Sequence, residues 1–172
     1  MMKRPSVSYL LAATLALIVC TQAPGWAQKP TNLSGKWVFV QGKSEGTPTV
    51  PRIFNTTGAP AGSNEMVISQ TAAAVNVRIG GVNFVYRLDG TEANISADGR
   101  AGFPIGKATW DGGKLVATLT QEVFSTAKGD YVKVPLKEVY GVANGVLTLE
   151  RSRTHLNGKA DSQKLVYARA SS

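Results

Sequence analysis

The sequence predicts an all-β protein: an antiparallel up-and-down meander of eight to ten strands. Short runs rich in Val, Leu, Thr and aromatic residues recur along the chain, and no helical periodicity follows the N-terminal segment. Such a pattern is typical of an up-and-down barrel or a strongly curved sandwich. Between the runs lie turn pairs, at Gly80-Gly81, Asp89-Gly90, Asp98-Gly99, Asn144-Gly145 and Asn157-Gly158.

The clearest element is a β-hairpin over residues 106–122. Its turn is Asp111-Gly112-Gly113, which supplies the positive-φ residues that a tight hairpin needs. Successive strand side chains point to opposite faces, so one face of this hairpin is predicted to be buried and the other wetted. The buried face carries Trp110, Leu115, Ala117 and Leu119, and the wetted face carries Lys107, Thr109, Lys114, Thr118 and Thr120.

The other strands are read from the same alternation. The first, 35–40, holds Trp37 as a core anchor, and a Gly/Pro-rich loop over 41–64 follows it as either a lid or an unstructured insertion. Pro135 lies in a strand over 131–140 and has no N–H to donate, which indicates a bulge or a sheet edge. The remaining predicted strands are 65–71, 73–79, 82–88, 92–96, 146–154 and 161–169.

The N-terminus has the three parts of a secretory signal peptide. Lys3 and Arg4 form the positive region, an apolar run follows, and Gly25-Trp26-Ala27 places small residues at the cleavage positions. We therefore expect a signal peptide over 1–27, cleavage after Ala27, a single β-barrel domain over 28–172, and a periplasmic or secreted location.

Two other uses of this segment were weighed. A transmembrane anchor is disfavoured, because the apolar run from Tyr9 to Cys20 is shorter than the roughly 20 residues that span a bilayer. A lipoprotein attached through Cys20 is disfavoured because Val19 stands where Gly, Ala or Ser usually precedes the lipidated cysteine.

Composition excludes several classes of function. Cys20 is the only cysteine, so the expected mature domain has neither a disulfide nor a thiol nucleophile. The net charge of +8, lowered by two without Lys3 and Arg4, favours contact with anionic surfaces, including an anionic envelope surface. The basic residues are scattered singly, so specific nucleic-acid binding is not expected.

No catalytic or metal-binding constellation is visible. His155 is the only imidazole, which argues against a metal site and against a Ser–His relay. Asp89, Asp98 and Asp111 lie in glycine turns, where hydrogen bonding within the turn explains a carboxylate. We therefore expect neither an enzyme nor a bound cofactor.

The opening Leu33-Ser-Gly-Lys-Trp37 resembles the first-strand signature of the calycins, which include lipocalins, fatty-acid-binding proteins and avidin-like barrels. Residues 110–116 and 165–169 resemble late strands of fatty-acid-binding barrels, and the whole arrangement resembles small exported bacterial lipocalin-like proteins of undefined role. The resemblance implies a barrel with structural roles for Gly35 and Trp37, and small-molecule binding. The chain departs from lipocalins in having no helix after the last strand, and from fatty-acid binders in having no helical lid pattern over 41–64.

The last two strands carry an unusual inward pattern. Arg151 and Arg153 continue the apolar face of their strand, while Tyr167 and Arg169 share a face of the next one. Three guanidiniums and a phenol near one end of the barrel would suit a carboxylate or phosphate, which Arg binds bidentately. The alternative is that one arginine stacks on Trp37, as the resemblance implies, and the others reach solvent at the rim.

Two functional hypotheses follow. In the first, an exported non-enzymatic barrel binds a small, partly apolar, anionic molecule, and the 41–64 loop is a mobile rim. In the second, an envelope interaction module with a solid core contacts another protein or a polyanion. Small inner-face residues, Ala73, Ala108 and Ala117, leave room for a cavity in the first hypothesis. The candidate ligand-binding residues are Tyr86, Trp110, Arg151, Arg153, Tyr167 and Arg169.

Overall fold

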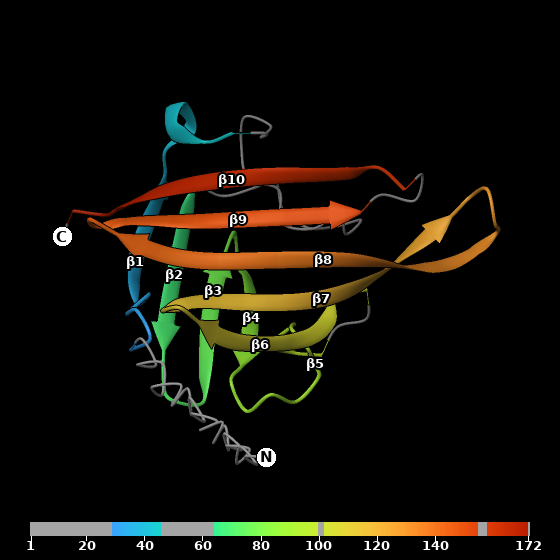
Figure 1. The fold of residues 1–172 in the computed structure, drawn as a ribbon, viewed down its shortest axis with the longest axis horizontal. Coiled ribbons are helices and arrows are strands. Elements are labelled where there is room, and N and C mark those ends of the chain that lie inside the picture. Colours follow the sequence, from blue (N-terminus) through green and yellow to red (C-terminus); the bar gives the residue numbers. More distant parts are fainter. Residues whose placement is uncertain (1–28, 46–63, 100–101, 155–157, 172) are drawn as a thin grey trace, which may run out of the picture.

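The computed structural model describes residues 29–45, 64–99, 102–154 and 158–171. This part of the chain forms one antiparallel sheet of ten strands with the order β4-β3-β2-β1-β10-β9-β8-β7-β6-β5, and a single 3-10 turn, η1 (Gln41–Lys43) (Figure 1). The strands are β1 (Gly35–Phe39), β2 (Glu65–Gln70), β3 (Ala74–Ile79), β4 (Val82–Arg87), β5 (Ala93–Asn94), β6 (Ile105–Asp111), β7 (Lys114–Ser125), β8 (Asp130–Ala143), β9 (Val146–Thr154) and β10 (Ala160–Arg169).

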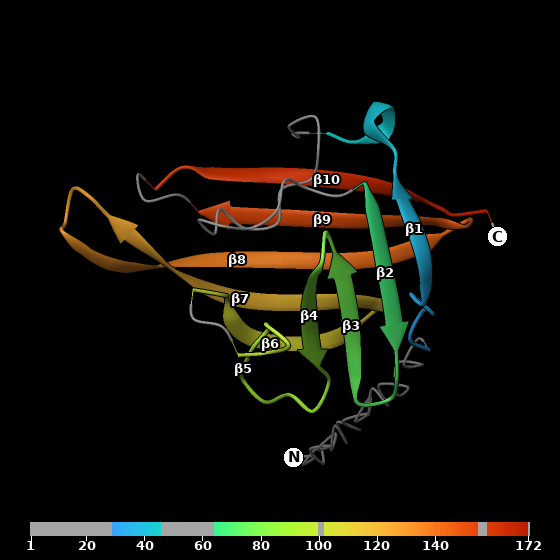
Figure 2. The same cartoon turned by 180° about the vertical axis from the view of Figure 1, so that it is seen from behind.

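The sheet curls into a nearly closed barrel. Its two ends meet where Phe84 of β4 pairs with Ser96, just after β5. Backbone hydrogen bonds join Val85 N to Ile95 O at 2.8 Å and Ala97 N to Asn83 O at 3.1 Å. Figure 2 shows β1 to β4 running steeply across the direction of β7 to β10 on the far side. The predicted all-β meander is confirmed, and the structure selects the barrel over the sandwich.

The predicted alternation of buried and exposed side chains along the central hairpin is confirmed. Leu115, Ala117 and Leu119 of β7 are buried, while Lys114 and Thr118 are exposed. The turn has φ of 54° at Gly112 and 80° at Gly113, in the left-handed region that glycine adopts most easily. Ala73, expected on the inner face, is instead exposed in the turn between β2 and β3.

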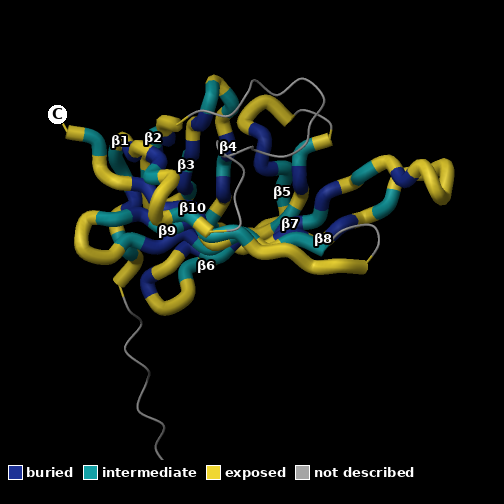
Figure 3. Tube along the Cα trace, turned by 90° about the horizontal axis from the view of Figure 1, so that it is seen from above, coloured by how far each residue is buried: buried dark blue, intermediate teal, exposed yellow. Residues whose placement is uncertain are grey.

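The β7–β8 hairpin is longer than the sequence indicated. β6 pairs with β7 only as far as Thr120, and β9 pairs with β8 only from Leu136 onward. Residues 121–135 therefore form a two-stranded extension of the barrel, which we call the β7–β8 arm (Figure 3). Pro135 lies just past the end of the β8–β9 ladder, which confirms the predicted sheet edge.

One end of the barrel is filled by the chain that leads into β1. Trp37 is fully buried, and its indole Nε1 donates to the carbonyl of Leu33 at 2.9 Å. The Arg169 guanidinium lies 4.5 Å from the centre of the Trp37 ring and donates to the Ser34 carbonyl at 3.2 Å. An arginine therefore stacks on Trp37, as the resemblance implied.

Several sequence-based predictions concern residues outside the described ranges. These are the signal peptide over 1–27, all of the 41–64 loop except 41–45 and 64, and His155. They remain predictions. Within the described ranges, none of the helical structure has the length and apolar character required of a membrane span.

Candidate functional site

A cluster of polar side chains crosses the barrel interior. Tyr86 of β4 donates its phenol proton to Glu138 Oε2 of β8 at 2.7 Å. Tyr140, two residues along β8, lies 3.0 Å from the Tyr86 hydroxyl and 3.5 Å from the same carboxylate oxygen. Arg151 of β9 donates to Glu138 Oε1 through Nε at 2.8 Å and forms an ion pair with it through Nη2 at 2.6 Å. The carboxylate thus binds two phenols on one oxygen and a guanidinium on the other.

Strand alternation and register explain why a carboxylate points inward here. Glu138 continues the inward face of β8 after Val134 and Leu136. It stands opposite Ala117 on one side and Arg151 on the other. The small alanine leaves space for the Glu138 side chain, and Arg151 supplies the opposite charge.

The cluster is largely removed from water. Glu138 is 0% exposed and the Arg151 side chain is 12% exposed. Removing the two charges from water costs free energy. Much of that cost is offset because the two groups form an ion pair and are hydrogen-bonded. Burial, the largest single cause, would lower the pKa of Arg151, but the charge of Glu138, the hydrogen bond to it and the neighbouring tyrosines together raise that pKa, so Arg151 stays protonated.

The three inward tyrosines are held as neutral phenols. Burial is the main cause that raises the pKa of Tyr86 and of Tyr140, and the charge of Glu138 raises both further. Burial likewise raises the pKa of Tyr167, although Arg151 opposes the shift. These phenols therefore keep their protons at neutral pH, where they can donate or accept hydrogen bonds.

Two buried polar atoms at the site have no hydrogen-bond partner among the described residues: the hydroxyl of Tyr167 and Nε of Arg153. Tyr167 is 0% exposed and its ring packs edge-on against Phe39, with the centroids 5.6 Å apart. A buried donor without a partner costs about 1–3 kcal/mol, so such atoms usually face a water or a ligand. Both atoms can donate a hydrogen bond to a carboxylate or phosphate oxygen.

The structure brings together only part of the predicted ligand-binding set. Tyr86 and Arg151 meet through Glu138, which both contact. Arg153 follows Arg151 on the same face of β9. Trp110 is half-buried and packs against the apolar core.

The predicted grouping of three guanidiniums at one barrel end is wrong. Because β9 and β10 are antiparallel, Arg151 pairs with Gln163 and Arg153 with Asp161, while Arg169 lies at the opposite end of β10 beside Trp37. Alternation shows that these arginines share one face of the sheet, but not at which end of the barrel each one lies. That depends on the register between β9 and β10.

Glu138 and Tyr140 were missed by the sequence analysis. The signal was present, since alternation from Val134 and Leu136 along β8 leads directly to both residues. A charged residue on an otherwise apolar face was the clue to an internal ion pair.

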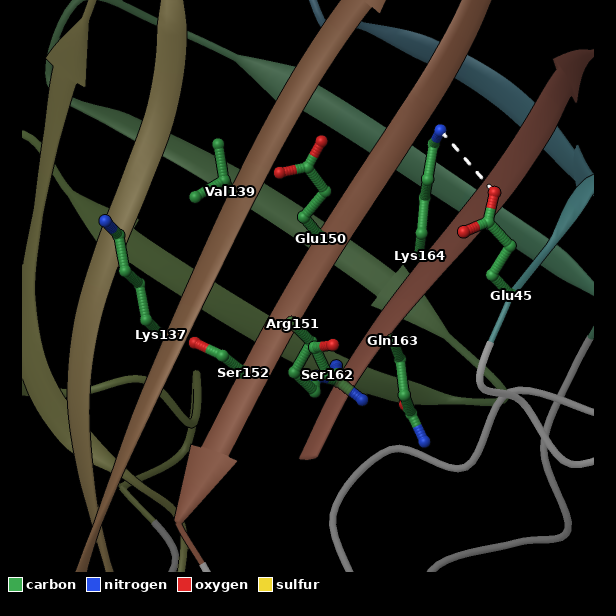
Figure 4. A pocket seen from close by; sticks show the side chains of 9 residues that line it. All are labelled: Glu45, Lys137, Val139, Glu150, Arg151, Ser152, Ser162, Gln163 and Lys164. Atoms are coloured by element: carbon green, nitrogen blue, oxygen red, sulfur yellow. Dashed lines mark ion pairs between the residues drawn. The ribbon is translucent and has the colours of Figure 1, made fainter. Parts of the chain in front are cut away.

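A pocket of about 370 Å³ lies along β8, β9 and β10, and it shares Arg151 with the polar cluster (Figure 4). Most of its lining side chains alternate with those that point into the core, and one ion pair, Lys164 to Glu45 at 3.9 Å, lies at its border. This pocket is not the predicted interior cavity, which remains a prediction. The lining residues are Glu45, Lys137, Val139, Glu150, Arg151, Ser152, Ser162, Gln163 and Lys164.

The part of the chain that the structure describes contains no group of three or more His, Cys, Asp or Glu residues that could hold a metal ion. No protein-family model and no curated protein sequence matches the chain. Among solved structures, the chain is similar to the "REP1-NXSQ fatty acid transporter", with 16% identity and a TM-score of 0.49 over 81% of this chain and 97% of that one. What this protein binds is therefore inferred from its own residues.

Proposed function

We propose that this protein is an exported, non-enzymatic, calycin-like barrel that binds one small, partly apolar, anionic molecule in its interior. The observation that carries the proposal is the pair of buried donors without partners among the described residues, Tyr167 Oη and Arg153 Nε. An acceptor oxygen of a ligand at either donor would recover the free energy lost by burying it without a partner.

The surroundings of Arg153 support a ligand that is partly apolar. Leu119, Leu136 and Arg153 stand in one cross-strand row on the inner face of β7, β8 and β9. Both leucines belong to the buried core. An alkyl or aromatic body can lie against them while its anionic group reaches the guanidinium, which is the usual composition of a small-molecule site.

The same cluster supports binding rather than catalysis. The inward phenols keep their protons, Arg151 stays charged, and Glu138 accepts hydrogen bonds on both carboxylate oxygens. A general acid or base needs a pKa near the working pH and access to the reacting proton. Neither feature is present in the described cluster.

Replacing Arg153 by Ala tests this proposal. Thermal-shift and native mass-spectrometry screens against fatty acids, phospholipids and aromatic acids should identify anionic binders. A charge-assisted hydrogen bond contributes about 1.5–3 kcal/mol, so Arg153→Ala should weaken the best of them roughly tenfold to one-hundredfold. Arg78→Ala, at an exposed position of β3, is the matched control. Unchanged affinity in Arg153→Ala, or no binder at all, contradicts the proposal.

A second candidate function is contact with a polyanion through the outer surface. Lys107, Thr118, Lys137 and Ser152 are exposed and form one cross-strand row on β6 to β9, at the edge of the pocket in Figure 4. Two cations that alternate with two hydroxyls along the row suit a chain of sulfate or phosphate groups. This observation favours the polyanion version of an envelope interaction module.

Retention on immobilised heparin tests the second candidate. The double variant Lys107→Ala/Lys137→Ala should elute at lower salt than the wild type, because two contacts to the polyanion are lost. The matched control Lys128→Ala/Lys133→Ala removes the same charge from the β7–β8 arm. Equal elution of both double variants would assign retention to net charge alone.

We also propose export with cleavage after Ala27, on the basis of the signal-peptide pattern alone. The mass of the protein recovered from periplasmic and culture fractions tests it, since the mature chain should begin at Gln28. An uncleaved N-terminus in those fractions contradicts the proposal.

A further inference from the structure

We infer that Glu138 is an internal counter-ion that occupies the anion-binding edge of Arg151 and so limits the ligand of the barrel to a single negative charge, held at Arg153. The inference rests on the proposed interior binding function and specifies the ligand class of that site.

The geometry shows that Arg151 is already engaged. Its Nε and Nη2 atoms lie 2.8 Å and 2.6 Å from Glu138 Oε1. These two nitrogens form one edge of the planar guanidinium, the edge through which arginine binds carboxylates and phosphates. A ligand anion would have to displace Glu138 in order to use it.

Glu138 cannot easily be displaced. Its other oxygen accepts from Tyr86 at 2.7 Å, and Tyr140 lies within 3.5 Å. The residue is 0% exposed, so a displaced carboxylate would stay buried without its charge partner, which is strongly unfavourable. Arg151 is therefore a structural cation in the wild-type protein.

Around Arg151 the buried charges cancel, and Arg153 is the next guanidinium on the same face of β9, whereas Arg169 lies at the opposite end of β10 beside Trp37. Glu138 cancels Arg151, and Gln163 beside them is neutral. Asp161 stands opposite Arg153 in the register and is exposed. A guanidinium whose buried Nε has no partner among the described residues matches one monoanionic group, and a second negative charge would lie close to Glu138.

Dodecanoate and dodecyl phosphate test the inference, because they share an alkyl chain but carry one negative charge and close to two at pH 8. The wild type should bind dodecanoate at least as tightly as dodecyl phosphate. Glu138→Gln keeps the size of the side chain but removes the negative charge that pairs with Arg151, so its affinity ratio should shift toward the phosphate at least tenfold. The control Glu150→Gln removes a carboxylate from the exposed face of β9 and should leave the ratio unchanged.

A second variant covers the case in which Glu138→Gln does not fold. In Glu138→Gln/Arg151→Gln the buried pair is removed as a unit, and the preference for the monoanion should return to that of the wild type. A folded Glu138→Gln with an unchanged ratio overturns the inference but leaves the binding function intact. A wild type that prefers the phosphate more than tenfold also overturns it, whatever the variants do. If the wild type binds neither compound nor any other anion, the proposed function itself fails.

Discussion

Gly35 shows how a single residue adjusts the closed end of the barrel. Its φ is 142°, and a Cβ atom at this position would come within 2.6 Å of Arg169 Nη1. That guanidinium stacks on Trp37 and donates to the Ser34 carbonyl. A side chain at residue 35 would therefore strain the backbone and push Arg169 from the indole.

Gly35→Ala should lower the free energy of unfolding by about 1–3 kcal/mol, as expected for a non-glycine residue in a sparsely populated backbone region. Urea denaturation measures the change. Gly42→Ala is the control, because that glycine has no atom within 4 Å of an added Cβ; it should change stability by less than about 0.5 kcal/mol. Equal effects of the two substitutions would contradict both the backbone strain at residue 35 and the displacement of Arg169.

Tyr86 and Tyr131 offer a second comparison of single residues. Tyr86→Phe removes the 2.7 Å donor to buried Glu138 and should cost about 1–3 kcal/mol of unfolding free energy, because one carboxylate oxygen loses its closest partner. Tyr131→Phe changes a 65% exposed phenol and should cost less than about 0.5 kcal/mol. A Tyr86→Phe variant as stable as the wild type would mean that water or Tyr140 replaces the lost bond.

At the scale of elements, the β7–β8 arm differs from the rest of the barrel. Beyond the barrel it has only two strands, and an isolated pair of strands is marginally stable in water. Phe124 and Tyr131 pack edge-on across it, with the ring centroids 5.4 Å apart, yet they are 50% and 65% exposed. The two largest apolar side chains of the arm therefore keep much of their surface in solvent, although Val134 near its base is buried.

Amide hydrogen exchange should follow this difference. Arm residues 122–133 are expected to exchange faster than residues 114–120 of the same hairpin, because the latter have neighbours on both sides. Mass spectrometry of peptic fragments provides the measurement. Equal protection of the two segments would contradict the expectation and indicate that the arm is covered in solution.

Local patterns predicted the elements well and their lengths less well. The 111–113 turn and the alternation of 114–120 specify the central hairpin almost completely. The arm was missed because its turn, residues 126–129, has no two-residue glycine signal, although Gly129 adopts a φ of 66°. Alternation along the sequence also predicted that Arg151 points inward. Its pairing with Glu138 could not be predicted in this way, because it depends on the register between β8 and β9.

At the scale of the whole molecule, barrel closure creates contacts that no local pattern encodes. Tyr86 and Glu138 are 52 residues apart, and they meet only because β4 curls round to close the sheet. The strand pattern predicted an antiparallel meander, as a barrel or a curved sandwich, but not how far neighbouring strands are shifted along one another. That shift decides which side chains face each other across the interior.

The buried phenols predict how the whole fold responds to alkaline pH. Burial raises the pKa of Tyr86, Tyr140 and Tyr167 in the folded protein. An unfolded phenol has a pKa of about 10. Below that pH both states hold the protons and these groups leave stability unchanged. Above it the unfolded state loses protons that the folded state keeps, so the free energy of unfolding falls as pH rises.

Three such groups together should remove up to about 4 kcal/mol per pH unit above pH 10. Urea midpoints between pH 8 and pH 11.5 measure the slope, and phenolate absorbance reports ionisation. In Tyr140→Phe the slope should fall by about one third, since one of the three groups is gone. The phenolate absorbance of the buried tyrosines should appear only when circular dichroism shows unfolding. This part of the absorbance should be smaller in Tyr140→Phe. Complete phenol ionisation in a protein that keeps its native circular dichroism would mean that the interior cluster is open to water. It would contradict the conclusion that buried, neutral phenols bind Glu138.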